Sequence, residues 1–332
     1  MAKDARRATR AEGFAPPRFD ESRARRWLLI GLGVLWLLDA LLQMQPGMFT
    51  MDMISTIMRP AATGNAAALT ALIDWSIRLV TPHLVAFNWS IVAAQFVLGA
   101  ALLSGRRRIV RAGLWASVAF SLLVWVFGEG LGQLLTGSAT ALTGAPGSAF
   151  FYAVASALLL LPAGTWSHPH GRTDAATWTV SLAFLLGAAL QLSHVFWTGL
   201  GLEAPFGDAY MMPQPHALRA AINAVASLAS RAPVALNATL IALFLGLGVL
   251  VVLRTRSRAA FWAMLALITV VWVFGQDAGM FWSGMATDPN SGPLLALLLA
   301  SGHAGWQGGK RAAGVDGAHR APTAPAPSRS PV

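Results

Sequence analysis

Three acidic side chains stand in or directly after long apolar stretches, where proton transfer is the chemistry they could perform. Asp39 lies about twelve residues into an apolar run, with Gln43 one helical turn further on the same face. Glu129 and Asp277 each follow an apolar run that ends in Val-Trp-Val-Phe-Gly. A carboxyl group removed from water costs several kcal/mol unless it is hydrogen-bonded or takes up a proton. These acids are therefore the candidate catalytic residues. The alternative is that they are protonated or hydrogen-bonded groups that pack inside a helix bundle.

The segments around the last two acids belong to an internal repeat. Val124–Pro146 and Val271–Pro293, offset by 147 residues, are identical at ten of 23 positions without a gap. The matches include Trp, Phe and three Gly, which a general excess of Leu and Ala does not explain. In the second copy Gly187 stands where the first has Asp39. Aromatic and amide side chains that recur at offsets of 147 to 149 are the candidate cofactor-binding residues: Trp125 and Trp272, Gln43 and Gln191, Asn88 and Asn237.

Methionine and histidine gather in the segments that follow apolar runs. Thioether and imidazole ligands suit copper, particularly Cu(I). Methionine is also a common gap-filler, and no Met-x-Met or His-x-His array recurs in both copies. Copper binding is thus one hypothesis, and its weak candidate ligands are His83, His194, His216, Met48 and Met51. Cysteine is absent, which excludes disulfides, thiolate metal sites and cysteine nucleophiles.

Composition indicates which elements must position these residues. Of 332 residues, 55% are hydrophobic and 11% charged, against roughly 25% charged in soluble domains. Apolar runs of the length that crosses a bilayer occur at Trp27–Met44, Leu84–Leu103, Ile109–Phe127, Pro146–Ala163, Ala176–Trp197, Pro233–Leu253, Ala259–Phe274 and Gly292–Trp306. The sequence therefore predicts an all-α integral membrane protein with eight transmembrane helices, arranged as two tandem four-helix bundle repeats in the same orientation. The predicted units are a disordered tail at 1–24, membrane repeats at 25–165 and 172–306, and a second disordered tail at 308–332.

Basic residues predict the orientation of these spans. With the N-terminus inside, 20 of the 24 Lys and Arg fall in inner segments, and only Arg59, Arg78, Arg219 and Arg231 fall in outer ones. This asymmetry is the positive-inside pattern. It favours a multi-pass protein of a bacterial-type inner membrane with both termini cytoplasmic. The net charge of +10 is then a topology signal, the partner is the lipid bilayer, and nucleic-acid binding is disfavoured.

Two kinds of outer segment complete the predicted architecture. Ala66–Val80 and His216–Ser230 carry apolar residues at helical spacing, which predicts amphipathic helices on the outer membrane surface. The Gly-, Thr- and Pro-rich stretches after the third and seventh spans are candidates for re-entrant loops. Irregular backbone at membrane depth survives only when it is buried in protein or lines a cavity. A polar cavity mouth is therefore expected near Glu129 and Asp277.

The first span also carries a family resemblance. Its pattern Gly33-x-x-Trp36-x-x-Asp39-x-x-x-Gln43 resembles the opening helix of the DoxX/DoxD-like membrane proteins, in which a Gly and an aromatic precede a small residue and then Lys or Gln. The four-span unit is similar too, and one such protein is the membrane subunit of thiosulfate:quinone oxidoreductase. This chain departs by its duplication and by its acid at Asp39. The resemblance implies a quinone-interacting subunit that works with other membrane redox subunits.

Three functional hypotheses remain open from the sequence. The first is a DoxX-like inner-membrane protein in a quinone-linked redox or envelope electron-transfer process. The second is a transporter of a small solute or metal ion, in which the two repeats move around a central site. The third is a non-catalytic assembly or scaffold subunit.

Overall fold

The computed structural model describes residues 23–162, 166, 175–252 and 258–303. Every regular element in these ranges is a helix, which agrees with the predicted all-α class. The predicted tails at 1–24 and 308–332 lie almost wholly outside the described residues. Three helical stretches are long and apolar enough to cross a membrane, and they indicate a helical membrane protein: Ala67–Leu103, Arg107–Phe127 and Pro233–Leu250.

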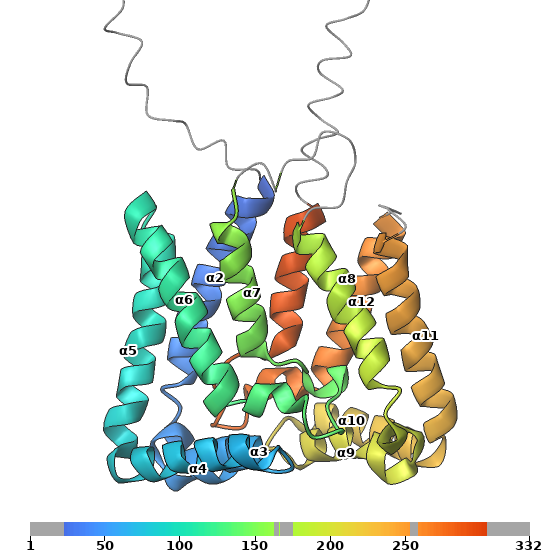
Figure 1. The fold of residues 1–332 in the computed structure, drawn as a ribbon. Helices are drawn as coiled ribbons and strands as arrows, with labels where there is room; N and C mark the ends of the chain where they lie inside the picture. The colour runs from blue at the N-terminus through green and yellow to red at the C-terminus, as the bar shows by residue number, and fades with distance from the viewer. Residues whose placement is uncertain (1–22, 163–165, 167–174, 253–257, 304–332) are drawn as a thin grey trace, which may run out of the picture.

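Long helices run side by side through the molecule (Figure 1). They are α2 (Arg23–Leu42), α5 (Leu84–Leu103), α6 (Arg107–Phe127), α7 (Ser148–Leu160), α8 (Ala175–Leu190), α11 (Pro233–Val252), α12 (Arg258–Phe274) and an unlabelled helix at 291–303. The most extensive pairings are α2 with α5, α6 with α7, and α8 with α11. The helices α2, α6 and α12 all start at the same end of the molecule, so their first residues bring arginines to that end (Figure 1).

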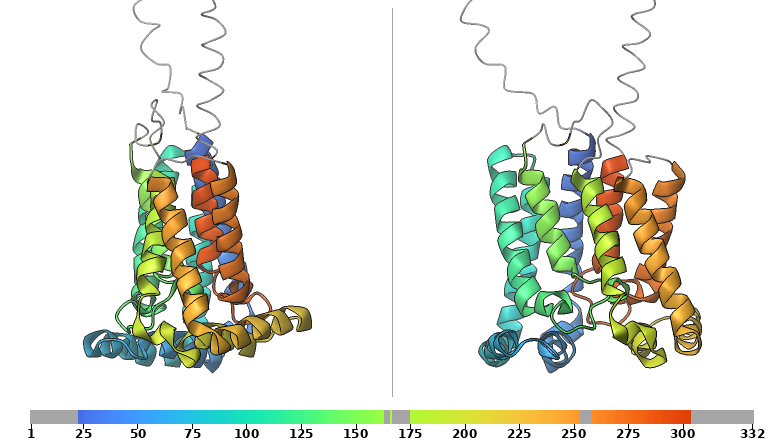
Figure 2. Two further views of the ribbon diagram at one scale, coloured as in Figure 1. Left: turned by 90° about the vertical axis from the view of Figure 1, so that its right-hand side faces the viewer. Right: turned by 45° about the vertical axis from the view of Figure 1, so that its right-hand side comes forward.

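A second group of helices lies across the opposite end of the molecule. They are α3 (Arg59–Ala62), α4 (Ala67–Val80), α9 (Gly199–Met211) and α10 (His216–Arg231), and two turned views show them beneath the ends of the long helices (Figure 2). The helices predicted at Ala66–Val80 and His216–Ser230 are thus confirmed as α4 and α10. Each has one buried stripe, through Ile73 and Ile77 in α4 and through Ile222 and Ala226 in α10.

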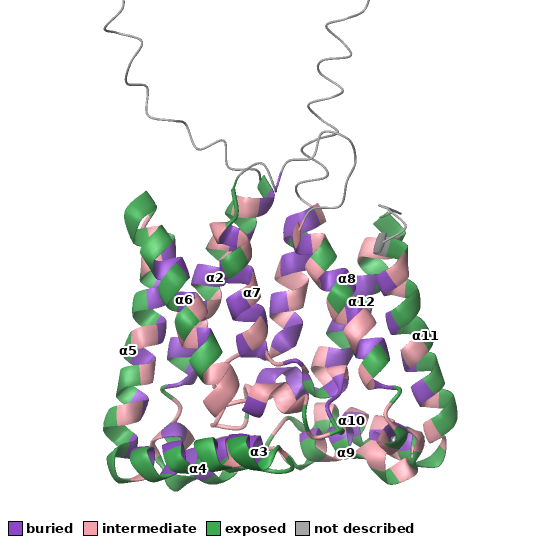
Figure 3. Ribbon diagram, in the orientation of Figure 1, coloured by how far each residue is buried: buried purple, intermediate pink, exposed green. Residues whose placement is uncertain are grey.

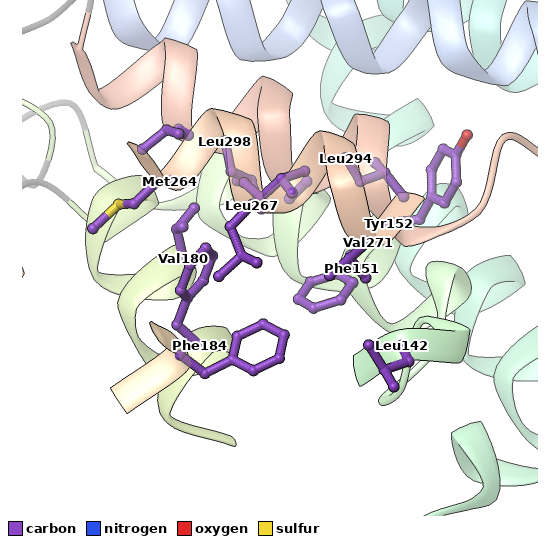
Figure 4. Packing of buried hydrophobic residues seen from close by; sticks show 14 of the residues in the cluster. Leu142, Phe151, Tyr152, Val180, Phe184, Met264, Leu267, Val271, Leu294 and Leu298 are labelled. Carbon is purple, nitrogen blue, oxygen red and sulfur yellow. The ribbon is translucent and has the colours of Figure 1, made fainter. Parts of the chain in front are cut away.

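Burial divides the long helices into an inner and an outer set (Figure 3). The main apolar core joins α7, α8, α12 and the 291–303 helix, where Phe151, Phe184, Leu267 and Leu294 pack together (Figure 4). The outward faces of α5, α6 and α12 are apolar as well as exposed, with Phe96, Trp115 and Trp262 at 59%, 58% and 63% exposure. Such faces are favourable next to lipid and unfavourable in water.

Two predicted span boundaries are wrong. The span predicted at Ala176–Trp197 ends as a helix at Leu190, and a separate 3-10 helix follows at His194–Trp197. The span predicted at Pro146–Ala163 begins only at Ser148, because Pro146 and Gly147 belong to the preceding loop and Gly147 has a left-handed φ of +113°. Apolar composition alone does not mark these ends, since Leu192, Val195 and Phe196 continue the apolar run beyond Leu190.

Candidate functional site

Two loops with the same hydrogen bond follow α6 and α12. The indole nitrogen of Trp125 donates to the carbonyl oxygen of Pro146 at 2.7 Å, and Trp272 donates to Pro289 at 2.8 Å. Left-handed residues follow each tryptophan, among them Gly132 (φ +62°) and its sequence counterpart Gly279 (φ +75°). The predicted pairing of Trp125 with Trp272 therefore corresponds to a shared structural role. Each indole closes a loop and has its donor satisfied by backbone.

The ungapped alignment is wrong beyond these glycines. It pairs Pro146 with Pro293, whereas the residue that accepts the tryptophan hydrogen bond in the second loop is Pro289. The donor and acceptor are 21 residues apart in the first loop and 17 in the second. The second loop is therefore four residues shorter, and Ser148 corresponds to Ser291.

Glu129 and Gln276, which the offset of 147 residues pairs, make the same backbone contact in the two loops. The backbone N–H of Ala149 donates to Glu129 Oε1 at 3.0 Å, and that of Gly292 donates to Gln276 Oε1 at 3.1 Å. The Ser148 hydroxyl adds a second bond to Glu129 Oε1 at 2.7 Å. The same position thus holds an acid in the first half and a neutral amide in the second. A polar cavity does lie at Glu129, and Gly279 and Met280 of the second loop line it, but the Asp277 side chain is not among the lining residues of either cavity at Glu129.

A cavity of about 390 Å³, which we call the lateral pocket, is lined by residues of α2, α4, α5, α6 and α7. Its mouth is marked by lining residues that are also exposed, namely Trp75, Leu79 and Leu123 at 53%, 59% and 58%. Its apolar walls include Val80, Phe87, Ile91, Phe120, Val124 and Phe127. Polar groups line its inner end, which Asp39, Gln43, Gln95, Ser121, Glu129, Tyr152 and Asp288 form. The lateral pocket therefore has an apolar entrance on the outer flank of the bundle and a polar, acidic interior.

Five buried polar atoms at this inner end make no hydrogen bond of standard geometry within the protein: Asp39 Oδ1, Gln95 Oε1, Ser121 Oγ, Glu129 Oε2 and Tyr152 Oη. Buried polar groups are nearly always hydrogen-bonded, and one left unsatisfied costs about 1–3 kcal/mol. The Tyr152 hydroxyl and the Asp39 carboxyl lie within hydrogen-bonding reach of each other, so they can partly satisfy one another. Gln95 Oε1, Ser121 Oγ and Glu129 Oε2 have no partner at all, which indicates that a polar ligand or water completes their hydrogen bonds.

Asp288 reaches this site from the second half of the chain. Its loop is held against the end of α2, where the backbone N–H of Ala286 donates to Gln45 Oε1 at 2.8 Å. The side chain itself accepts from the N–H of Asn290 at 2.7 Å and from the Thr287 hydroxyl at 2.9 Å. The inner end of the lateral pocket is therefore built jointly by both halves.

The corresponding place in the second half is nearly filled. The cavity there measures about 30 Å³. Phe244, the sequence counterpart of Gln95, packs edge-on against Phe184 with ring centroids 5.7 Å apart. A Cβ on Gly187, the counterpart of Asp39, would lie 3.1 Å from the Cβ of Ala141. The second half thus has neither the space nor the acid for an equivalent site.

Glu129 and Asp288 lie in loops outside the spanning helices, and burial raises the pKa of both carboxyls. Burial, reinforced by the nearby Asp288 charge, raises the pKa of Glu129 from 4.5 to about 8. Burial likewise raises the pKa of Asp288. Near neutral pH Glu129 is therefore mainly the neutral acid, which can donate a hydrogen bond as well as accept one.

These shifts predict how stability depends on pH. A carboxyl with a raised pKa binds more protons in the folded state, so its contribution is most favourable below pH 4.5 and is lost as pH rises to about 8. The thermal midpoint in detergent should fall between pH 5 and pH 8, and Glu129→Gln should reduce that fall. Asp74→Asn, at an exposed position on α4, is the control and should leave it unchanged. Equal pH dependence in all three proteins would contradict this assignment.

Two amide pairs among the candidate cofactor-binding residues join helices. Gln43 Nε2 donates to Asn88 Oδ1 at 2.6 Å, and Asn88 Nδ2 donates to the Gln43 carbonyl at 3.0 Å, which ties α2 to α5. Asn237 Nδ2 donates to the Gln191 carbonyl at 3.0 Å, which ties α11 to the end of α8. Of these four side chains only Gln43 also lines the lateral pocket.

An Asn88→Ala variant should lose stability, because it removes both bonds and leaves the buried Gln43 amide unpaired. We expect a loss of about 1–2 kcal/mol, measured as a lower midpoint of unfolding in detergent. Ser90→Ala on the same helix, where the exposed hydroxyl bonds only its own helix, is the matched control. A midpoint equal to that of this control would show that the pair contributes nothing.

The candidate metal ligands lie on separate elements. His83 ends the 3-10 helix before α5, His194 begins the one after α8, and His216 begins α10. Met48 is fully buried, while Met51 is 52% exposed. In the described part of the chain, no group of three or more His, Asp and Glu side chains could hold a metal ion.

Comparisons with known proteins bear on the family resemblance. No family model matches the chain. No curated protein and no solved structure matches it either.

Sequence reasoning missed two residues of the inner end. Tyr152 is one of only two tyrosines in the chain and stands in an apolar span, a signal that was present in the composition. Asp288 directly precedes Pro289, and a gapped alignment would have placed it at the loop end beside the site.

Proposed function

We propose that this chain is an eight-span, duplicated, DoxX-like protein of a bacterial-type inner membrane, and that its lateral pocket binds a lipid-soluble quinone. The observation that carries the proposal is the group of buried polar atoms without a protein partner, Gln95 Oε1, Ser121 Oγ and Glu129 Oε2, in an otherwise largely apolar pocket that also contains the Asp39 and Tyr152 side chains. A quinone and its quinol have complementary chemistry: the quinone carbonyls accept hydrogen bonds from hydroxyl donors such as Ser121, the quinol hydroxyls donate to acceptors such as Gln95 Oε1, and the ring and tail are apolar.

The position of the pocket supports a ligand that arrives through the bilayer. Its mouth residues belong to α4 and α6 and are exposed on the flank of the bundle, next to the apolar outward faces of α5 and α6. The arginines that begin α2, α6 and α12 share the opposite end, which the positive-inside rule assigns to the cytoplasm. The pocket then opens in the outer half of the membrane.

The residues at the inner end have distinct roles in this proposal. Tyr152 donates a hydrogen bond to one ligand oxygen, and the neutral Glu129 acid can donate through Oε2, which has no protein partner. Asp39 takes or returns a proton at Oδ1. The aromatic rings of Trp36 and Phe120 offer flat apolar surface. A bound quinone would supply two-electron redox chemistry, with other membrane redox subunits as electron partners.

The Tyr152→Phe variant tests this assignment, because it keeps the ring and removes only the hydroxyl donor. Binding of decylubiquinone to protein in lipid nanodiscs can be followed by quenching of tryptophan fluorescence, since Trp36 and Trp75 line the pocket. Loss of one hydrogen bond in a buried site should weaken binding about tenfold. Tyr210→Phe on α9, the other tyrosine of the chain, should bind like the native protein.

Two outcomes would contradict the proposal. One is that native protein binds no quinone. The other is that Tyr152→Phe and Tyr210→Phe weaken binding equally, which would place the quinone outside the lateral pocket.

A further inference from the structure

A second cavity of about 260 Å³, which we call the vestibule, adjoins the lateral pocket. Loops from both halves form it, with Gln133 and Thr143 on one side and Thr287 and Asn290 on the other. The vestibule lies next to α3, because its lining residue Gln133 donates a hydrogen bond from Nε2 to the Ala61 carbonyl of α3 at 3.1 Å. Thr143 is exposed, so the vestibule reaches the solvent surface at this end.

The two cavities share a wall. Ile57, Glu129, Ser148, Thr287 and Asp288 line both. Glu129 Oε1 accepts hydrogen bonds from the Ser148 hydroxyl and the Ala149 N–H, while Oε2 has no partner in the protein. Carboxyl groups that face two cavities at once can exchange a proton with either of them.

The titratable groups around this shared wall are all acids. The titratable side chains that line the two cavities are Asp39, Glu129, Tyr152 and Asp288, and no Lys, Arg or His is among the lining residues. Toward the arginine-bearing end, by contrast, packing closes the path. Leu28 and Leu32, on the same face of α2 as Asp39, are fully buried. The ring centroids of Trp36 and Tyr152 lie 4.4 Å apart.

We propose that the vestibule is a water-filled passage through which Glu129 and Asp288 exchange protons between the lateral pocket and the solution at the α3 and α9 end. A ligand in the lateral pocket would gain or lose protons from that side alone. The identity of that ligand rests on the proposed function, but the passage itself does not.

The chain contains no cysteine, so single-cysteine variants of the full protein need no prior substitutions. We would place thiols at Thr287 in the shared wall, at Thr143 at the solvent edge, and at Ser104 at the arginine-bearing end. Each variant in liposomes would be treated from one side at a time with membrane-impermeant methanethiosulfonates, one cationic and one anionic. A small neutral methanethiosulfonate would verify that each thiol is present and reactive.

Thr287→Cys should react from the same side as Thr143→Cys and from the side opposite Ser104→Cys. Above pH 8, where Glu129 is ionised, the cationic reagent should modify it at least about fivefold faster than the anionic one, and this preference should shrink as the pH is lowered. Adding Asp288→Asn should reduce this preference, while Thr143→Cys should remain reactive. Failure of Thr287→Cys to react with either charged reagent, or reaction from the arginine-bearing side, would overturn the passage.

The labelling requires no quinone, which separates the two proposals. One-sided labelling of Thr287→Cys without any quinone binding would leave the passage standing and remove the proposed function. Quinone binding without such labelling would do the reverse.

Discussion

A Gly132→Ala variant should lose the lateral pocket together with much of its thermal stability in detergent. Gly132 has a φ of +62°, and a Cβ at this position would run into the backbone of Pro146. That backbone carries the carbonyl that accepts the Trp125 hydrogen bond, so the loop cannot yield without breaking it. A left-handed alanine alone costs about 1 kcal/mol, and the overlap with backbone should raise the total to roughly 3 kcal/mol or more.

Gly137→Ala is the matched control for this substitution. Gly137 also has a left-handed φ, +77°, but a Cβ there would meet nothing within 4 Å. It should lose only about 1 kcal/mol and keep quinone binding. Thermal midpoints and quinone affinities of the two variants should be measured in the same detergent. Equal losses in both would show that left-handed strain, and not the contact with Pro146, accounts for the effect.

A Ser121→Phe variant should keep its fold and lose ligand binding. Ser121 is fully buried, lines the lateral pocket and leaves its hydroxyl without a partner. A phenyl ring at this position enters a cavity of about 390 Å³, so the overpacking cost of about 1–3 kcal/mol that a filled core would impose should be largely avoided. Quinone affinity should fall at least about tenfold, because the ring occupies the space that the ligand needs.

Leu122→Phe, at the neighbouring position, provides the comparison. Leu122 is 42% exposed on the outer face of α6 and does not line the pocket. Its binding curve should match that of the native protein. If Ser121→Phe binds quinone as well as Leu122→Phe does, the lateral pocket is not the binding site.

The sequence predicted the helical elements well and the site in part. Asp39, Gln43 and Glu129 were candidates from their positions, and they do converge at the inner end of one cavity. The amphipathic helices α4 and α10 were predictable from apolar spacing, because one stripe of each is buried. The eight spans and their orientation remain predictions that three long apolar helices support only in part.

The remaining features of the site could not be predicted from the sequence because they depend on tertiary packing. Asp277 does not line the cavities at Glu129, and the loop conformation instead brings Asp288 to the lateral pocket from the shorter second loop. The asymmetry between the halves also depends on packing, since Phe244 and Ala141 occupy the space that remains open in the first half. An alignment of the halves can detect a lost acid but cannot detect a filled cavity.

The most direct test of the central claim is mass spectrometry of the lipids that co-purify with the protein in mild detergent, with metals measured in parallel. Native protein and Leu122→Phe should each carry about one quinone per chain, and Ser121→Phe should carry almost none. Native protein free of quinone, although its source membranes contain it, would contradict the account. Equal quinone content in Ser121→Phe and Leu122→Phe would contradict it as well.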